Sequence, residues 1–222
     1  MDDSDSMKLL ILAGGQSSRM GSPKHLLPIP STNQPLYQQL VHVMHIAFPE
    51  THTIHFSVTD NSALDDVLQQ GEMLLPTKTG PRHVGLKRIS DKAAQNIGPA
   101  AGLIAAHRYD QNANWVVVAC DFPLLDPAAL CQLRESYQAP ITCFVNSAGF
   151  SEPLLAVWGP EALRKLLENV EAGRSGPNYT VKQLKGKLIA PTEHDWILNT
   201  NTREEWDVAR LRIKQPQSIE GT

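Results

Sequence analysis

The chain has 222 residues, of which 41% are hydrophobic and 14 are glycine; its 20 Lys and Arg against 23 Asp and Glu give a net charge of −3. This length suits one large domain, and the apolar share excludes a disordered chain. The slightly negative net charge argues against a broadly positive surface of the kind that binds nucleic acid, so we expect no nucleic-acid partner. A local basic patch would still be compatible with this net charge.

Targeting signals and metal-like cysteine patterns are not found in the sequence. No apolar run approaches the roughly 20 residues of a membrane-spanning helix, and the start, from Met1 to Ser6, is acidic where a signal peptide is basic. The three cysteines form no metal-like pairs, which argues against a disulfide scaffold and a zinc ribbon. We therefore expect a cytoplasmic protein without membrane attachment.

Short apolar runs alternate with helical stretches along the first 150 residues. Strands are predicted at Lys8–Ala13, Thr53–Val58, Leu86–Ile89, Trp115–Cys120 and Ile141–Val145. Helices are predicted at Pro35–Phe48, Ala63–Gln70, Ala100–Tyr109 and Pro127–Tyr137. This alternation predicts an α/β fold, a doubly wound and mostly parallel sheet with helices on both faces. In such sheets, ligands bind at the carboxyl ends of the strands.

The pattern changes beyond about residue 150. Strands or extended pieces are predicted at 152–157, Lys187–Ala190 and Trp196–Leu198, and helices at Pro160–Glu171, Tyr179–Leu184 and Arg203–Arg212. Thr202 and Glu205 have the spacing of a capping box for the last helix. We expect one domain over residues 1–212 and a disordered polar tail over 213–222. Residues 71–88 are the least regular stretch and are read as a mobile basic loop or a merely solvated one.

The segment from Leu12 to Lys24 carries the clearest chemistry. A buried strand runs into Gly14 and Gly15, whose missing Cβ atoms let backbone N–H groups turn around an anion. Arg19 and Lys24 follow and can neutralise phosphate oxygens. The segment is neither a Walker loop nor a Gly-x-Gly-x-x-Gly fingerprint. The alternative is a glycine-rich turn with surface cations.

Asp121 ends a second buried run and precedes Phe122-Pro123. A carboxylate at the ligand-bearing edge of the sheet suits Mg²⁺ that bridges nucleotide phosphates. The alternative is a helix cap or turn residue, a role for which Asp126 is also placed.

The Leu12–Lys24 segment resembles the signature of the MobA-like nucleotidyltransferases, Leu-Ala-Gly-Gly-x-Ser-x-Arg-Met-Gly-x-x-Lys. The double glycine is most similar to the molybdenum cofactor guanylyltransferases, although Pro23 stands where many of them have aspartate. The resemblance spans about Lys8 to Arg210 and implies a Rossmann-like nucleotidyltransferase fold.

The resemblance also implies site residues. The nucleotide-binding positions are Leu12, Ala13, Gly14, Gly15, Arg19, Lys24, Ser57, Asp91 and Asp121. Of these, Arg19, Lys24 and Asp121 would be catalytic, and Asp121 would hold Mg²⁺. Residues of the acceptor side would be Glu152, Asn199 and Asn201, the two asparagines on a strand just before the last helix.

The resemblance favours transfer of a nucleoside monophosphate from an NTP, GTP above others, to a phosphorylated acceptor, molybdopterin or the molybdenum cofactor, with release of pyrophosphate. One alternative is a cytidylyltransferase or a sugar- or alditol-phosphate nucleotidyltransferase. An alternative of another class is a non-catalytic protein that binds nucleotide or delivers a cofactor.

Other candidate groups have a simpler structural interpretation. His42 and His45 are spaced for one helix face but lack an evident third ligand, so they are expected in the core rather than on a metal. Cys120 and Cys143 lie in apolar strands and are expected to be small core residues.

Overall fold

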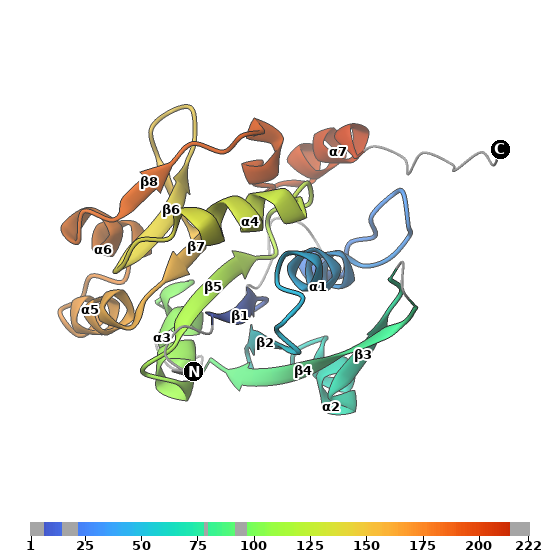
Figure 1. Cartoon of the computed structure of the whole chain (residues 1–222), viewed down its shortest axis with the longest axis horizontal. Helices are drawn as coiled ribbons and strands as arrows, with labels where there is room; N and C mark the ends of the chain where they lie inside the picture. Colours follow the sequence, from blue (N-terminus) through green and yellow to red (C-terminus); the bar gives the residue numbers. More distant parts are fainter. Residues whose placement is uncertain (1–6, 15–21, 78–79, 92–96, 214–222) are drawn as a thin grey trace.

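A computed structural model of the chain describes residues 7–14, 22–77, 80–91 and 97–213 (Figure 1). Its centre is a sheet of eight strands in the order β3-β4-β2-β1-β5-β7-β6-β8. The strands are β1 (Met7–Leu12), β2 (Thr53–Val58), β3 (Glu72–Leu75), β4 (Arg82–Ser90), β5 (Asn114–Ala119), β6 (Ile141–Val145), β7 (Ser151–Trp158) and β8 (Lys187–Ile189).

Helices connect most of these strands. They are α1 (Leu36–Ala47), α2 (Asp65–Gln70), α3 (Ala100–Tyr109), α4 (Pro127–Ser136), α5 (Pro160–Glu171), α6 (Pro177–Gln183) and α7 (Arg203–Arg212), with short 3₁₀ helices at Lys24–Leu26 and His194–Ile197. Within the described ranges, no helix has both the length and the apolarity needed to cross a bilayer.

The strand directions bring several strand ends to one edge of the sheet. β1 pairs in parallel with β2 and β5, and β2 with β4. β7 is antiparallel to both β5 and β6, so the carboxyl end of β6 and the start of β7 reach the same edge. At that edge Leu12 pairs with Ser57 on one side and with Ala119 on the other.

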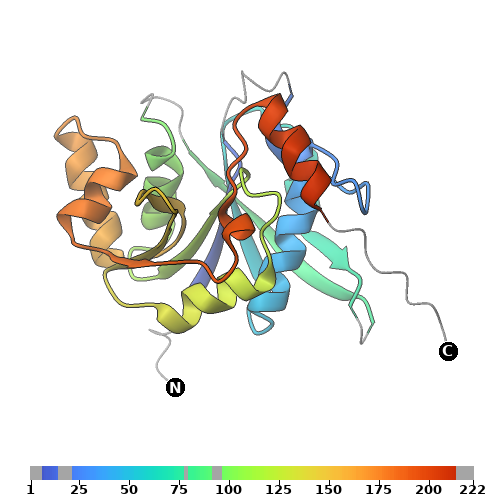
Figure 2. The ribbon, with the colours of Figure 1, turned by 90° about the horizontal axis from the view of Figure 1, so that it is seen from above.

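Helices cover both faces of the sheet, and each face has its own apolar core (Figure 2). One core joins the sheet to α1, α4 and α7 and includes Leu40, Leu130 and Trp206. The other joins it to α3, α5 and α6 and includes Leu103 and Leu163. The mostly parallel, doubly wound α/β fold predicted from the sequence is confirmed.

The stretch 71–88, predicted to be an irregular loop, is instead largely a strand pair. β3 and the first four residues of β4 form an antiparallel ladder from Glu72↔Gly85 to Leu75↔Arg82. In β4, buried Val84 and Leu86 alternate with exposed or partly exposed residues. The loop prediction was wrong because polar and basic residues occupy the solvent face of these outer strands. Lys78 lies outside the described residues.

The segment before α7 also differs from its prediction. Trp196–Leu198 is not extended, because the N–H groups of Trp196 and Leu198 donate to carbonyls three residues earlier and close a 3₁₀ helix. Asn199 and Asn201 therefore lie in a loop and not on a strand. The capping box at Thr202 and Glu205 is confirmed.

All eight strands belong to one sheet. The single domain over 1–212 stays a prediction. Of the predicted tail 213–222, all but Ile213 lies outside the described residues.

Candidate functional site

The turn after β1 begins where the glycine motif was predicted. The N–H of Ala13 donates to the carbonyl of Ser57 at 2.9 Å, so the pairing with β2 extends one residue past Leu12. Gly15 and Arg19 lie outside the described residues, and their roles stay predictions.

Asp91 follows β4 and packs against this turn. Its side chain is buried, and its Oδ2 accepts a hydrogen bond from Ser57 Oγ at 3.3 Å. A Cβ atom added to Gly14 would lie 2.5 Å from the same Oδ2, so the glycine allows the close approach. Gly14, Ser57 and Asp91, predicted from three distant segments, are thus brought together.

The second carboxylate oxygen of Asp91, Oδ1, is buried without a hydrogen-bond partner among the described residues. Burial raises the pKa of Asp91, because desolvation disfavours the charged form, while the Ser57 hydrogen bond lowers it. An unpaired buried oxygen is costly unless a partner arrives. Asp91 is therefore suited to accept a hydrogen bond from a ligand.

Asp121 lies two residues after the end of β5, the strand next to β1. The N–H of Cys120 donates to the carbonyl of Leu12 at 3.2 Å, and the N–H of Thr200 donates to the carbonyl of Asp121 at 2.9 Å. The Thr200 hydroxyl donates to the same carbonyl at 3.3 Å. These bonds fix Asp121 between the end of β1 and the loop before α7.

Lys24 joins these segments through its side chain. Its Nζ lies 2.9 Å from Asp121 Oδ1 and 3.0 Å from Asn201 Oδ1. The side chains of Lys24 and Asp121 are only 13% and 23% exposed, so solvent screens their attraction less than at the open surface. One cation and two oxygen ligands, separated by up to 177 residues in the chain, form a compact polar cluster.

Glu152 is the second residue of β7, on the acceptor side of the predicted site. Burial raises the pKa of its carboxyl, and the negative charge of Asp121 raises it further. Asn146 Nδ2 donates to Glu152 Oε1 at 3.1 Å, which opposes that rise. Glu152 is therefore within electrostatic range of Asp121.

Asn199 shares the loop with Asn201, and its side-chain oxygen is buried without a partner in the described part of the chain. Asn146 and Thr200 belong to this site but were not singled out in the sequence. An Asn before Ser-Ala-Gly is a turn signal, which could have drawn attention to Asn146. The role of Thr200 depends on a contact 79 residues away, for which the sequence holds no local sign.

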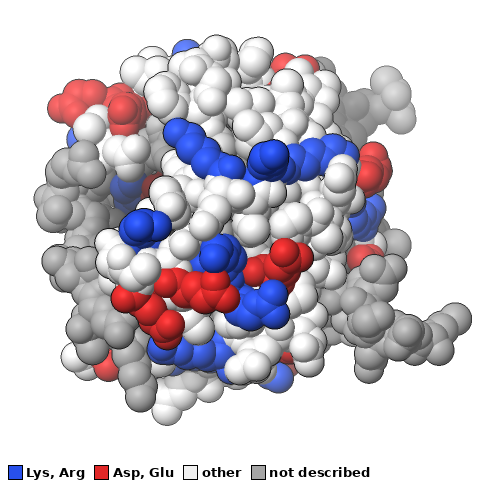
Figure 3. All heavy atoms as spheres, turned by 90° about the vertical axis from the view of Figure 1, so that its left-hand side faces the viewer, with Lys and Arg blue, Asp and Glu red and all other residues white. Residues whose placement is uncertain are grey.

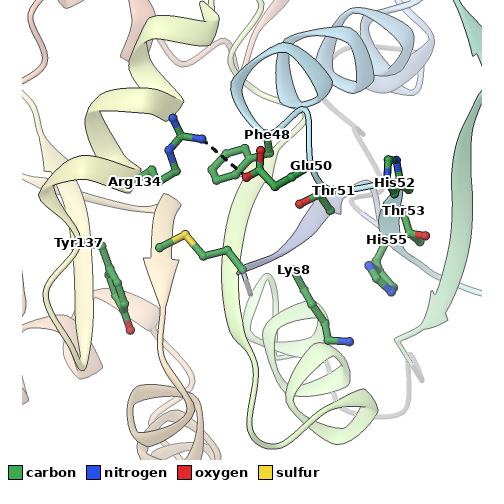
Figure 4. A pocket seen from close by; sticks show the side chains of 10 residues that line it. Lys8, Phe48, Glu50, Thr51, His52, Thr53, His55, Arg134 and Tyr137 are labelled. Atoms are coloured by element: carbon green, nitrogen blue, oxygen red, sulfur yellow. Dashed lines mark ion pairs between the residues drawn. The ribbon is translucent and has the colours of Figure 1, made fainter. Parts of the chain in front are cut away.

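A hollow of about 650 Å³ lies at the opposite, amino-terminal edge of the sheet (Figure 4). Its cations already have structural partners: Lys8 pairs with Asp110, and Arg134 donates to the carbonyl of Ala47 and lies near Glu50. None of the predicted site residues lines it. The site residues that the structure describes lie instead at the edge where the parallel strands β1, β2, β4 and β5 end.

Of the two histidines expected in the core, His42 is only partly buried. His45 is buried and its pKa is lowered mainly by desolvation. In the described ranges, no three His, Cys, Asp or Glu side chains gather as a metal site would. Cys120 and Cys143 are buried, and burial raises the pKa of both thiols, that of Cys143 to about 12. Asp126 caps α4, as the sequence suggested.

The face that carries α5 and α6 shows lysine and arginine side chains together with acidic ones (Figure 3). Lys165 and Glu168 of α5 form an ion pair there at 2.9 Å. The expectation that the chain binds no nucleic acid stays a prediction.

The family model of the MobA-like NTP transferase domain matches residues 9–186. Among curated relatives, a "Probable molybdenum cofactor guanylyltransferase" of Bacillus mycoides (strain KBAB4) is 25% identical over 206 residues, in a match that covers 89% of this chain and 92% of the relative. A "Molybdenum cofactor biosynthesis bifunctional protein" of Synechocystis is 24% identical over 89% of this chain, a match that spans 52% of that protein.

Solved structures are similar in fold. Molybdopterin-guanine dinucleotide biosynthesis protein A of Archaeoglobus fulgidus has a TM-score of 0.67 at 19% identity, with 93% of this chain and 98% of the other covered. A UDP-glucose pyrophosphorylase complexed with UDP-glucose has a TM-score of 0.67 at 12% identity, with 93% and 97% covered. At such identities the likeness supports the fold alone.

Proposed function

This chain is a nucleotidyltransferase of the MobA-like NTP transferase family. We propose that it transfers a guanylyl group from GTP to the molybdenum cofactor, in which molybdopterin binds the molybdenum, and releases pyrophosphate. The observation that carries the proposal is the cluster of Lys24, Asp121 and Asn201 at the strand edge that also holds Gly14. The names of the curated relatives support the choice of acceptor.

The reaction requires positioning and charge neutralisation rather than a protein nucleophile. An oxygen of the acceptor phosphate forms a bond to the α-phosphorus of GTP. The bond from that phosphorus to the bridging oxygen breaks, and pyrophosphate leaves with the electron pair. Negative charge grows on the leaving group, and the Lys24 ammonium would stabilise it if it turns from Asp121 to the phosphates. The turn at Gly14 would offer backbone N–H groups to the triphosphate.

Mg²⁺ would be held by Asp121, with Asn201 as a second oxygen ligand. The two side-chain oxygens already face one positive charge, the Lys24 ammonium, and carboxylate and amide oxygens are ligands that Mg²⁺ accepts. A cation held mostly by water and substrate phosphates needs few protein ligands, so a sparse site fits. When bound, Mg²⁺ would neutralise phosphate charge and orient the triphosphate.

Asp91 supports GTP over CTP. Its buried Oδ1 has no partner among the described residues, and guanine presents N1–H and N2–H donors on one edge, whereas cytosine presents only its N4 amino group. An acceptor left unpaired would cost about 1–3 kcal/mol.

Glu152 and Asn199 would contact the acceptor. Glu152 is half-buried within range of Asp121, and Asn199 has a buried, unpaired side-chain oxygen in the described structure. Both can accept hydrogen bonds from an acceptor that carries N–H or O–H groups.

Calorimetric competition between GTP and CTP with Mg²⁺, followed by a pyrophosphate-release assay with molybdopterin, tests the proposal. We expect GTP to bind at least tenfold more tightly, Asp91→Ala to reduce that preference, and the surface variant Asp110→Ala to keep it. Equal affinities or tighter CTP would contradict the guanylyl assignment. Nucleotide binding without pyrophosphate release from any acceptor would favour a non-catalytic binding protein instead.

A further inference from the structure

The hairpin that joins β6 to β7 follows the carboxyl end of β6 (Figure 1), and its last residue is Phe150. Phe150 is 65% exposed, although Phe144 on the preceding strand is fully buried. An aromatic ring that is exposed on a fixed turn is available to pack against the flat face of a ligand.

Asn146 holds the tip of this hairpin in place. Its side-chain oxygen accepts from the N–H groups of Ala148 and Phe150, both at 3.0 Å. Its own N–H donates to the carbonyl of Phe150 at 2.9 Å. Gly149 supplies the positive φ of 81° that the turn requires. The backbone that carries Phe150 is therefore fixed before any ligand binds.

The same asparagine links Phe150 to the proposed site. The N–H of Asn146 donates to the carbonyl of Phe150 across the hairpin, and Asn146 Nδ2 donates to Glu152 Oε1 at 3.1 Å. β7 begins directly after Phe150 and runs antiparallel beside β5, the strand that precedes Asp121. Phe150 therefore lies at the sheet edge that holds Glu152 and Asp121.

We propose that Phe150 determines acceptor specificity by stacking on a planar heteroaromatic ring of the acceptor. This inference rests on the proposed function and narrows its acceptor class, because an alditol or sugar phosphate has no ring face to stack. The turn residues before Phe150, Ser147, Ala148 and Gly149, are small and uncharged and leave the ring accessible. Aromatic stacking of this kind favours any flat ring system and requires no hydrogen bond.

The test compares Phe150→Ala with Phe150→Tyr and uses two probes, a pterin that carries a phosphomonoester and ribitol 5-phosphate. Titration of the wild type and both variants, with GTP and Mg²⁺ affinities measured in parallel, gives the binding constants without turnover. We expect Phe150→Ala to raise the Kd of the pterin phosphate about tenfold, Phe150→Tyr to retain wild-type affinity, and GTP affinity to stay unchanged in both. Where the enzyme turns over, the acceptor KM should rise while kcat is kept.

The inference is overturned if the wild type and Phe150→Ala bind the pterin phosphate equally, or if Phe150→Ala weakens ribitol phosphate to the same extent. A failure of the proposed function would be recognised by a different result. Binding of the pterin phosphate that depends on Phe150, without pyrophosphate release, would refute guanylyl transfer and leave the stacking role intact. Equal binding of the pterin phosphate by the wild type and Phe150→Ala, with guanylyl transfer to molybdopterin kept, would refute the stacking role alone.

Discussion

Gly14→Ala tests how tightly the glycine turn and Asp91 are packed. The added Cβ would lie 2.5 Å from Asp91 Oδ2 and 3.3 Å from its Cγ, whereas an ordinary contact begins near 3.4 Å. The carboxylate must therefore move by almost 1 Å. It has little room to do so, because Ser57 Oγ is hydrogen-bonded to the same oxygen. Ser57 is itself closely packed, since a Cβ atom added to Gly102 would lie 2.7 Å from its Oγ.

Overpacking of a buried site costs about 1–3 kcal/mol. In a domain of this size, 2 kcal/mol corresponds to a fall in Tm of roughly 4–8 °C. Because the displaced group is the proposed base-binding carboxylate, we also expect at least tenfold weaker GTP binding.

Thermal unfolding and calorimetric GTP titration measure the two effects. Gly176→Ala is the matched control, since a Cβ at Gly176 meets nothing within 4 Å and its φ is negative. If Gly14→Ala has the Tm and the GTP affinity of the control, the close packing of Gly14 on Asp91 is refuted.

Three further changes have defined outcomes. Asp121→Asn should lower turnover by roughly two orders of magnitude with the Tm kept, because a metal ligand is lost; Mg²⁺-dependent rates near wild type would remove Asp121 from that role. Lys24→Ala should weaken GTP binding roughly 10- to 100-fold, as the loss of a charge-assisted contact implies, whereas Lys165→Ala should not. Burial lowers the pKa of His55 from 6.5 to about 4, so the unfolded chain takes up a proton first as the pH falls. Stability should therefore drop between about pH 6.5 and 4, by up to about 3 kcal/mol, and urea unfolding of His55→Phe should show a flatter decline.

Much of the fold could be read from periodicity. The strands Thr53–Val58 and Ile141–Val145 and the helices Ala100–Tyr109 and Pro160–Glu171 have the predicted bounds. Their apolar runs are buried, and proline or glycine marks several of their ends, so local sequence and tertiary packing agree. β3 could not be read in the same way, because an edge strand buries little and its residues look like those of a loop.

The sequence by itself determined which sheet edge holds the candidate site. A strand that runs into Gly14, and another that ends just before Asp121, place a glycine turn and a carboxylate at one edge, since parallel strands end on the same side. These are local features, so neighbouring residues suffice to recognise them.

Only the tertiary structure decided which of these groups meet. The contact of Lys24 with Asp121 spans 97 residues and that with Asn201 spans 177, and the unpaired oxygen of Asp91 follows from burial against Gly14. A side chain's partner and its desolvation depend on what the fold packs around it, and residues far apart in the chain supply those neighbours.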